Sequence, residues 1–290
     1  MPSVVVVGGA NVDIQGRIDA AAIAGDSNPG RVTRSPGGVG RNIAHGVAAL
    51  GIETALITAL GDDVDGHWIA EITGAAGVDL ADAVWSSKPT AIYLAVLDET
   101  GELALAVNDM AILGELDRAV VDDRWARIVA ADVVAVDCNL EAETLAAVAD
   151  CGRPLFVDPV SAAKAHRIDG VLDRVHTIKP NRSELAALTG RPVADAESVE
   201  IAARSLLDRG VGRVVVSLGV TGGIAVEPGG TIAMPPPVVV EPIGSVTGAG
   251  DALLAGLVSA HLRGLDTAAS LRSALDGVAV AIRATGSVSG

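Results

Sequence analysis

Short runs rich in valine and isoleucine alternate along this chain with alanine-rich runs of helical periodicity. In one helical run Ile43, Val47 and Leu50 share a face, and Gly51 suits the C-terminal cap. A strand, a helix and a second strand form a right-handed crossover, which makes the two strands parallel. The alternation therefore predicts an α/β fold with a mostly parallel sheet covered by helices on both faces. The expected strands are residues 3–7, 54–60, 132–137, 154–158, 175–179 and 213–219, and the expected helices are residues 41–51, 67–77, 140–150, 181–190 and 198–210.

Two segments, residues 11–36 and 90–108, interrupt this alternation. The first is rich in Gly, Pro, Asn and Asp and contains no convincing helix. The second has two strand-like runs around Asp98–Gly101, which is the pattern of a β-hairpin. We expect a single domain, residues 1–290, with a small β lid from about residues 12–35 and 90–108. The alternating apolar side chains of the hairpin need cover, either from the domain below or from a second lid, and a second lid would give a homodimer.

Charge and composition limit the partners of the chain. The formal net charge of −15 repels nucleic acid and anionic membranes, and the 2% aromatic content leaves few side chains to stack on bases. There is no apolar stretch long enough to span a bilayer, and the chain starts with a strand-like run rather than a targeting segment. Cys138 and Cys151 fit neither a disulfide framework nor a zinc site. These features predict a cytoplasmic protein that binds small molecules, not nucleic acid or membranes.

Several common catalytic motifs are missing. Gly8 and Gly9 follow the first strand, but the dinucleotide-binding pattern G-x-G-x-x-G and the Gly-Lys pair of a P-loop are both absent. The five histidines lack the spacing of metal ligands, and there is no G-x-S-x-G nucleophile elbow. Hydride transfer, P-loop chemistry, zinc hydrolysis and serine-hydrolase chemistry are therefore disfavoured.

The segment Gly248-Ala249-Gly250-Asp251 directly precedes an apolar helical run. Backbone N–H groups at such a helix start are unhindered, and they can hold a phosphate group. Asp251 would stand beside them as a carboxylate that can accept a proton. The alternative is an ordinary helix cap, because Asp is favoured at helix N-termini.

Four other stretches place small or polar residues at strand ends or helix starts, where open α/β sheets bind ligands. A carboxylate after the first strand can accept hydrogen bonds from a vicinal diol. Each stretch also has a structural explanation: a turn, a glycine loop or a capping box. Together the five stretches favour a ligand site over capping alone. The four are Asn11 and Asp13; Gly37, Gly38, Gly40 and Asn42; Asn181 and Glu184; and Ser217, Gly219, Gly222 and Gly223.

Three motifs occur in a fixed order: G-G-x-G-x-N at 37–42, N-x-x-E at 181–184 and T-G-A-G-D at 247–251. This order resembles the PfkB, or ribokinase-like, family of carbohydrate and nucleoside kinases, over nearly the whole chain. The resemblance implies a ribokinase-like fold, and ATP-dependent phosphorylation of a sugar or nucleoside hydroxyl with Mg²⁺. A ligand sensor without catalysis is the alternative from another class, and the presence of both Asp251 and Glu184 speaks against it.

The resemblance also implies roles for the candidate residues. The general base would be Asp251, and the first amides of its helix would hold the charge on the transferred group. Asn181 and Glu184 would position Mg²⁺ through water. The residues expected to form the anion hole are Gly248, Ala249 and Gly250; those expected to bind substrate are Asn11, Asp13, Gly38, Gly40 and Asn42; and those expected to bind ATP are Asn181, Ser217, Gly219, Gly222 and Gly250.

The lid adds further candidates. Asn108 and Asp109 follow its last strand, and we expect them to bind substrate by reading the base of a nucleoside; an ordinary turn is the alternative. Ser27 and Asn28 in the preceding loop are weaker candidates for the same role. Ser245 stands where many relatives have an acid that helps to bind a monovalent cation, which argues against potassium activation.

Overall fold

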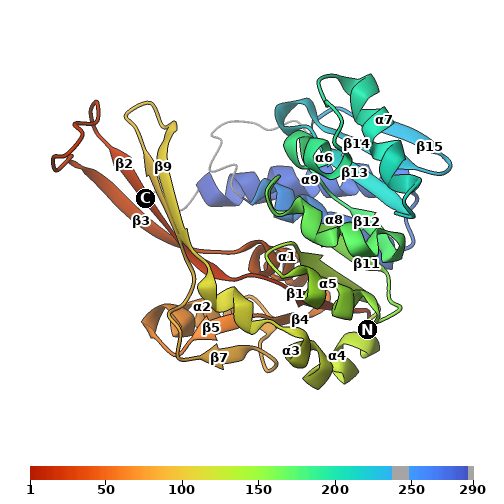
Figure 1. Ribbon diagram of the computed structural model, residues 1–290, viewed down its shortest axis with the longest axis horizontal. Coiled ribbons are helices and arrows are strands. Elements are labelled where there is room, and N and C mark those ends of the chain that lie inside the picture. Colours follow the sequence, from red (N-terminus) through yellow and green to blue (C-terminus); the bar gives the residue numbers. More distant parts are fainter. Residues whose placement is uncertain (237–247, 287–290) are drawn as a thin grey trace.

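The computed structural model describes residues 1–236 and 248–286, with side chains through residue 278. Within these ranges the strands form a nine-stranded sheet, a four-stranded sheet and a pair of short strands. Figure 1 shows how these sheets are arranged. The large sheet is parallel except for its last two strands, which pair antiparallel at one edge. In spatial order its strands are β15 (Gly230–Met234), β14 (Gly223–Glu227), β13 (Arg213–Ser217), β12 (Val175–Ile178), β11 (Leu155–Asp158), β10 (Val133–Asp137), β1 (Ser3–Val7), β4 (Glu53–Ile57) and β6 (Val78–Asp79).

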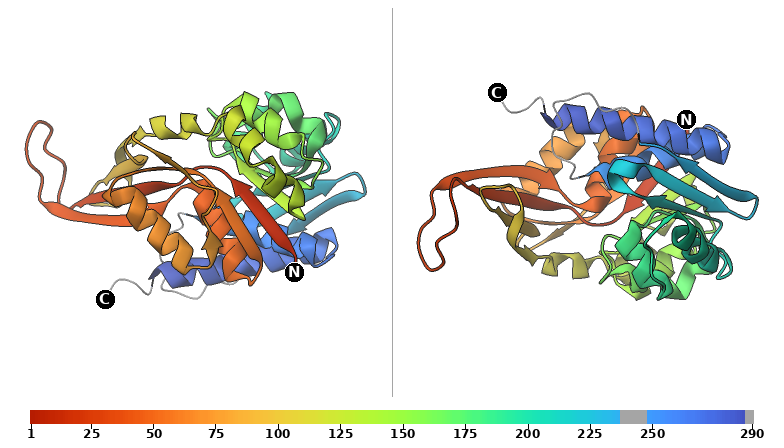
Figure 2. Two further views of the ribbon diagram at one scale, coloured as in Figure 1. Left: turned by 90° about the horizontal axis from the view of Figure 1, so that it is seen from below. Right: turned by 90° about the horizontal axis from the view of Figure 1, so that it is seen from above.

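Helices cover both faces of the large sheet, as predicted (Figure 2). Successive side chains of a strand point to opposite faces, so a run such as Val4–Val7 contributes to both cores. One face carries α1 (Val39–Ala49), α8 (Ala249–Leu262) and α9 (Thr267–Gly286). The opposite face carries η1 (Ala111–Glu115), α3 (Arg118–Asp123), α4 (Trp125–Ala130), α5 (Ala142–Ala149), η2 (Ala165–Arg174), α6 (Arg182–Thr189) and α7 (Ala196–Leu207).

Two predicted strands have different bounds in the structure. The strand expected at 54–60 is divided, because β4 stays in the large sheet whereas β5 (Ala59–Gly61) leaves it to pair with β7 (Val84–Ser86). β13 ends at Ser217, because the chain turns there into the short helix η3 (Gly219–Thr221). Glycine in the left-handed region brackets that turn.

The helix expected at 67–77 begins earlier, as α2 (Val64–Ala75). Asp63 caps it by accepting a hydrogen bond from Gly66 N at 2.8 Å. Among the described residues, no helix combines the length and the apolar character that crossing a bilayer requires.

The two interrupting segments pair with each other to form the four-stranded sheet, which we call the lid sheet. Its strand order is β3-β2-β8-β9, and Figure 1 shows it standing apart from the large sheet. β8 and β9 are the predicted hairpin, whereas the segment 11–36, which had no clear pattern, supplies β2 and β3. Closure of this sheet over a ligand stays a prediction. Its strands are β3 (Gly30–Gly37), β2 (Asn11–Ile18), β8 (Ile92–Leu97) and β9 (Leu103–Asp109).

Candidate active site

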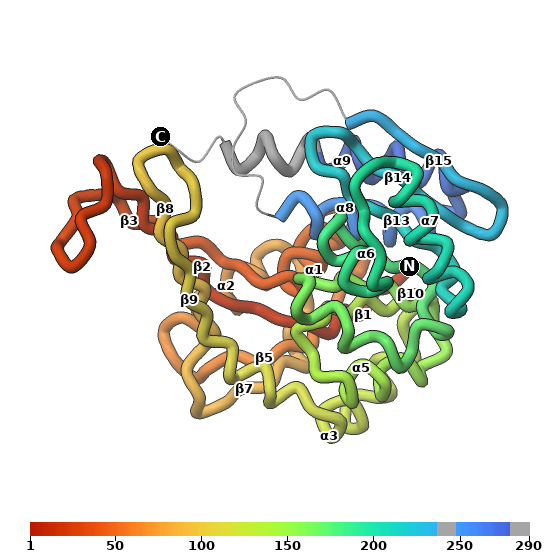
Figure 3. The backbone as a smooth tube through the Cα atoms, turned by 45° about the horizontal axis from the view of Figure 1, so that its top comes forward, coloured from red at the N-terminus to blue at the C-terminus, as the bar shows by residue number. Residues whose placement is uncertain are grey.

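Asp251 lies in the first turn of α8 and is 8% exposed. Asn42 of α1 donates a hydrogen bond from Nδ2 to Asp251 Oδ2 at 2.7 Å. The two helices pack side by side (Figure 3), so each brings its first turns to the same place. Burial raises the pKa of Asp251 to about 7, and the neighbouring carboxylate of Asp158 adds to the rise. The bond from Asn42 and the charge of Lys179 lower it. A carboxylate with this pKa is suited to accept a proton near neutral pH.

The N-terminus of α8 is built from residues without bulky side chains. Gly248 occupies the N-cap with φ 84°, a left-handed conformation that favours glycine. The first amides of an α-helix have no acceptor within the helix. A Cβ on Gly250 would lie 3.0 Å from Lys179 Nζ, so the absence of a side chain leaves this cation close to the backbone. The amides of Ala249 and Gly250 thus lie beside a cation, an arrangement suited to an anion.

The glycines at 37–40 let the start of α1 approach the end of β1. A Cβ on Gly38 would lie 2.5 Å from Ala10 Cα, and one on Gly40 would lie 2.7 Å from the carbonyl carbon of Gly8. Gly38 also has φ 94°. Backbone packing therefore requires small residues at these positions, whether or not they also contact a ligand.

Asp137 at the end of β10 holds this loop in place. Its Oδ2 accepts hydrogen bonds from Gly9 N at 2.8 Å and from Gly40 N at 2.7 Å. Its Oδ1 accepts one from Asn139 N at 2.8 Å. The side chain is fully buried, and burial raises its pKa to about 6 although these bonds oppose the rise. The amide of Gly40 is engaged inside the protein, so contact between Gly40 and a substrate stays a prediction.

Asn11 and Asp13 lie at the start of β2 and share a face of the lid sheet. Asn11 Nδ2 donates to Asp13 Oδ1 at 2.6 Å. Burial raises the pKa of Asp13, and the bond from Asn11 and the charge of Arg41 lower it. A Cβ on Gly37 would lie 2.4 Å from the carboxylate of Asp13, so this glycine leaves room for the pair. Arg41 interacts electrostatically with both Asp13 and Asp251, which places the two acids on one side of the molecule.

Asn181 and Glu184 form the capping box of α6 that the sequence offered as the alternative explanation. Asn181 Oδ1 accepts from Glu184 N at 2.9 Å, and Glu184 Oε2 accepts from Asn181 N at 2.8 Å. Glu184 Oε1 also accepts from Asn181 Nδ2 at 2.7 Å. Burial raises the pKa of Glu184, and these bonds and the charge of Lys179 oppose the rise. Both functions are compatible, because each carboxylate oxygen can accept a further bond from water.

The residues expected to bind ATP lie at the neighbouring strand end. Ser217 N donates to Pro180 O at 3.0 Å, which joins the end of β13 to the segment before α6. Gly219 and Gly222 have φ 60° and φ 98°, and a Cβ on Gly222 would lie 2.1 Å from Met234 O. The turn therefore demands glycine at these positions, and contact with ATP stays a prediction.

Register separates the two candidates in the lid sheet. Asn108 pairs with Tyr93, which pairs with Asp13, so these three side chains lie on one face. Asp109 pairs with Ile92 and lies on the opposite face. The structure therefore brings Asn108 to the face that carries Asp13, and it does not bring Asp109 there.

Asn28, one of the weaker candidates, does not join these groups. The side chain of Asn28 stabilises the loop in which it lies, because its Oδ1 accepts a hydrogen bond from Ile23 N at 2.7 Å. Ser245 lies outside the described residues, so the prediction about potassium has no structural test here.

The family model described as "pfkB family carbohydrate kinase" matches residues 1–290. The chain belongs to this family. It is 37% identical to the pseudouridine kinase of Escherichia coli (strain K12), over 93% of this chain and 87% of that protein. It is 35% identical to the uncharacterized sugar kinase YeiI of the same organism, over 98% of this chain and 79% of that protein.

Solved structures agree with the family and the fold. A carbohydrate kinase from Agrobacterium tumefaciens is 30% identical and superimposes with a TM-score of 0.81, over 100% of this chain and 92% of that one. Arabidopsis thaliana ribokinase, complexed with ribose and ATP, is 25% identical with a TM-score of 0.85, over 100% of this chain and 94% of that one. The predicted ribokinase-like fold is confirmed, and this PfkB-family protein is an ATP-dependent phosphotransferase.

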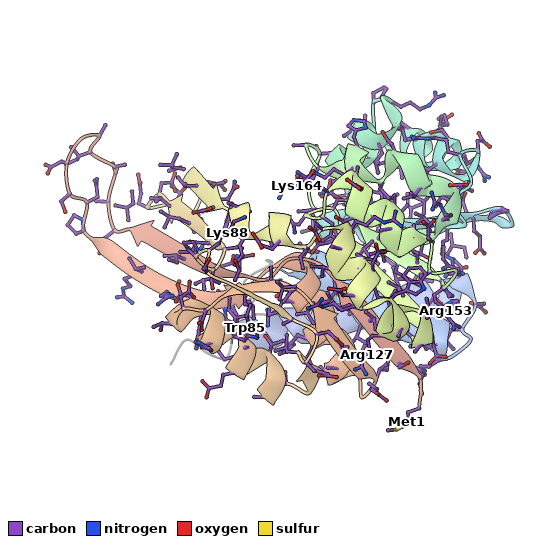
Figure 4. The ribbon with its side chains drawn as sticks, turned by 60° about the horizontal axis from the view of Figure 1, so that its bottom comes forward. Met1, Trp85, Lys88, Arg127, Arg153 and Lys164 are labelled. Carbon is purple, nitrogen blue, oxygen red and sulfur yellow. The ribbon has the colours of Figure 1, made fainter. Side chains whose placement is uncertain are left out.

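Sequence analysis of this kinase missed several charged residues of the site. Asp137, Asp158 and Lys179 each stand at or just after the carboxyl end of an apolar strand, and all three are buried. An ionisable residue that ends a buried strand is the signal that could have found them. Lys164, which Figure 4 labels, donates from Nζ to Asn139 Oδ1 at 2.6 Å and thus contacts the segment that follows β10.

Proposed function

We propose that this kinase transfers the γ-phosphoryl group of ATP to the 5′-hydroxyl of pseudouridine, giving pseudouridine 5′-phosphate and ADP. The observation that carries the proposal is the buried carboxylate of Asp251, which Asn42 holds at the open N-terminus of α8. The 37% identity to Escherichia coli pseudouridine kinase, over 93% of the chain, supports this nucleoside as the acceptor.

Asp251 is the general base of the proposed reaction. Its carboxylate accepts the proton of the 5′-hydroxyl while that oxygen attacks the γ-phosphorus. The new oxygen–phosphorus bond forms as the bond to the bridging oxygen of ADP breaks. The amides of Gly248, Ala249 and Gly250 stabilise the charge on the transferred group. A pKa raised to about 7 leaves a large share of Asp251 deprotonated at neutral pH and keeps it basic enough to act.

The ribose lies between the lid sheet and the start of α1 in this proposal. Asn11 and Asp13 bind its hydroxyls, because the carboxylate of Asp13 has acceptor capacity beyond the bond from Asn11. Gly38 and Asn42 line the same region from the start of α1. Asn42 also holds Asp251, the general base, through a hydrogen bond. The 5′-hydroxyl is thereby placed next to Asp251.

ATP occupies the neighbouring strand ends, along Ser217, Gly219 and Gly222. Mg²⁺ neutralises charge on its phosphates when bound. Asn181 and Glu184 fit this ion through water, because their own hydrogen bonds occupy the capping box whereas carboxylate lone pairs remain for water. Among the described residues, no three His, Cys, Asp or Glu side chains gather in a group that could hold a metal ion.

Asn108 reads the base of the nucleoside in this proposal. Pseudouridine has an N1–H donor where uridine has a carbon, so a fixed acceptor can tell them apart. Asn108 shares the face of the lid sheet that carries Asp13, and its side-chain oxygen is such an acceptor. A site that uses such a bond rejects the analogue lacking it by up to about 10⁴-fold.

A substrate panel tests the proposal. We expect ADP production with pseudouridine, and kcat/KM values at least tenfold lower with uridine, adenosine, ribose and fructose. Equal kcat/KM for pseudouridine and uridine would refute the assignment of the substrate. Preference for ribose would favour a ribokinase activity, which the fold shared with Arabidopsis ribokinase makes the second candidate. No ADP with any acceptor would point to a ligand sensor.

Two lid variants test how the base is read. Asn108→Ala should bring kcat/KM for pseudouridine down toward that for uridine. Asp109→Ala is the matched control, because Asp109 lies on the opposite face and should leave the selectivity unchanged. Selectivity that survives in both variants would assign the contact to another residue.

A further inference from the structure

Lys179 directly follows β12, and its ammonium group is buried against Asp158. Lys179 Nζ lies 3.1 Å from Asp158 Oδ2, and both side chains are 5% exposed. Removing both charges from water is costly, and a buried ion pair is often no more stable than two apolar side chains of similar volume. Stability alone therefore gives no reason for this pair at the end of a buried strand.

The position of the pair suggests a reason. Lys179 Nζ lies 3.0 Å from the place that a Cβ of Gly250 would occupy, so the cation touches the first turn of α8. It also interacts electrostatically with Glu184 and Asp251. An ammonium group has three donors. Among the described residues its close ionic partner is Asp158, and the other donors remain for a ligand.

We propose that Lys179 is a catalytic residue that contacts the γ-phosphoryl group during transfer, and that Asp158 is a positioning residue that holds its ammonium group beside α8. The inference rests on the proposed function, which places the γ-phosphoryl group at the amides of residues 248–250. When the bond from phosphorus to the bridging oxygen breaks, its electron pair stays on ADP. Lys179 stabilises the negative charge that develops on the phosphoryl group and this leaving oxygen. The proton of the acceptor goes to Asp251.

The same cation also acts on the base. Lys179 favours the charged form of Asp251 and lowers its pKa, whereas Asp158 and Asp137 raise it. Arg41 of α1 also interacts electrostatically with Asp251. Removing Lys179 should therefore move the acid limb of the pH–rate profile to higher pH. Removing the charge of Asp158 should move it to lower pH.

Three variants separate catalysis from folding. Lys179→Met should lower kcat at least about 10²-fold and leave KM for the nucleoside within about threefold. Lys179→Met leaves the charge of Asp158 buried without its partner, which can itself destabilise the fold. The double variant Lys179→Met/Asp158→Asn therefore removes both charges. We expect the double variant to regain the wild-type unfolding midpoint and to stay as inactive as Lys179→Met. Lys179→Arg keeps the charge and should retain more activity than Lys179→Met.

Lys88→Met is the matched control. Lys88 also pairs with a carboxylate, that of Glu115, but it is 50% exposed and lies outside the site. Its kcat and pH profile should equal those of the wild type. Recovery of kcat in the double variant, or a pH profile that Lys179→Met leaves unmoved, would overturn the inference and make the ion pair structural. Asp251→Asn is measured in parallel: full turnover there would refute the proposed function, whereas full turnover confined to the Lys179 variants refutes this inference alone.

Discussion

Asn42 and Asp251 stand 209 positions apart in the sequence, and Asn42 Nδ2 donates a hydrogen bond to Asp251 Oδ2 at 2.7 Å. The bond favours the charged form of the carboxyl group, so it lowers the pKa that burial and Asp158 raise. It also fixes the orientation of the carboxylate at the start of α8. Both the position and the protonation of the proposed base therefore depend on a residue from another helix.

Asp251→Asn keeps the shape of the side chain and removes the proton acceptor. We expect kcat to fall at least about 10²-fold, with KM for ATP little changed because the helix amides remain. A coupled assay of ADP production measures both. Asp266→Asn is the control, because Asp266 is an exposed cap that accepts from Ala269 N at 2.8 Å at the start of α9. Equal, small effects in the two variants would remove Asp251 from the mechanism; the side chain of Asp251 does not cap α8, whose N-cap is Gly248.

Asn42→Ala should change the pH dependence of the reaction. A general base acts when deprotonated, so wild-type kcat/KM should rise with pH through about 7, the pKa of Asp251. Without the donor of Asn42 this pKa rises, so the acid limb moves to higher pH. The variant should lose more activity at pH 6 than at pH 8.5. A loss of equal size at every pH would contradict the role of Asn42 in setting the pKa of the base.

Glu184→Gln tests the metal site. A glutamine can keep a capping box, so the unfolding midpoint should change little. If Glu184 positions Mg²⁺ through water, the Mg²⁺ concentration for half-maximal activity should rise about tenfold or more, while KM for the nucleoside stays nearly constant. Glu197→Gln replaces an exposed acid in the first turn of α7 and should leave the titration unchanged. An unchanged Mg²⁺ titration in Glu184→Gln would return Glu184 to a capping role alone.

The sequence predicted those features that local pattern determines. Alternating strands and helices gave the parallel sheet, Asp98–Gly101 marked the hairpin, and Asn181 with Glu184 marked the start of α6. The sequence pattern did not show β2 and β3, because these segments become strands by pairing with a distant one. β2 pairs with β8, some 80 positions away. The division at Thr58 likewise depends on β7, a distant partner of β5.

The candidate site was predictable in part. Glycines and polar residues at strand ends and helix starts predicted a site at the carboxyl edge of the sheet, and the structure brings Asn42 and Asp251 together there. The bond from Asn42 to Asp251 and the buried pair of Asp158 and Lys179 depend on which segments meet in space, and no local spacing encodes that. The sequence predicted the same role, reading the base of a nucleoside, for Asn108 and Asp109. Only the register of β9 shows that their side chains lie on opposite faces of the lid sheet.

Asp137→Asn tests the hydrogen bonds by which Asp137 holds the backbone at Gly9 and Gly40. Asparagine replaces one of the two acceptor oxygens by a donor, so a hydrogen bond from Gly9, Gly40 or Asn139 is lost. We expect the free energy of unfolding at pH 5 to fall by about 1–3 kcal/mol, and KM for the nucleoside to rise as the loop loosens. Asp132→Asn is the control, because its exposed carboxylate accepts from Ser3 N at 2.8 Å at the other end of the sheet.

The effect of Asp137→Asn should also depend on pH. The pKa of Asp137 is raised from 3.8 to about 6 in the folded chain. A carboxyl group with a raised pKa contributes stability that is present below pH 3.8 and is lost as the pH rises through about 6. Asparagine cannot titrate, so the stability difference between the wild type and the variant should be larger at pH 4.5 than at pH 7.5. Urea unfolding at both pH values measures it, and a difference that grows with pH would contradict the raised pKa.

The lid sheet has an apolar face opposite to the one that carries Asp13. Leu94 pairs with Val107, and Val96 pairs with Leu105, so these side chains lie together on that face. Leu105 is 60% exposed and Val107 is 53% exposed. An exposed group of this kind needs cover in water.

We expect a second copy of the lid sheet to cover this face, so that the protein is a dimer at micromolar concentration by light scattering. Leu105→Glu puts a charge in the middle of the contact, and two such charges would face each other across a symmetric interface. The variant should therefore be a monomer. Ile201→Glu is the control, because Ile201 is a similarly exposed apolar residue, 50% exposed, on α7. A monomeric wild type would reject the dimer, and dissociation by Ile201→Glu in place of Leu105→Glu would move the interface away from the lid.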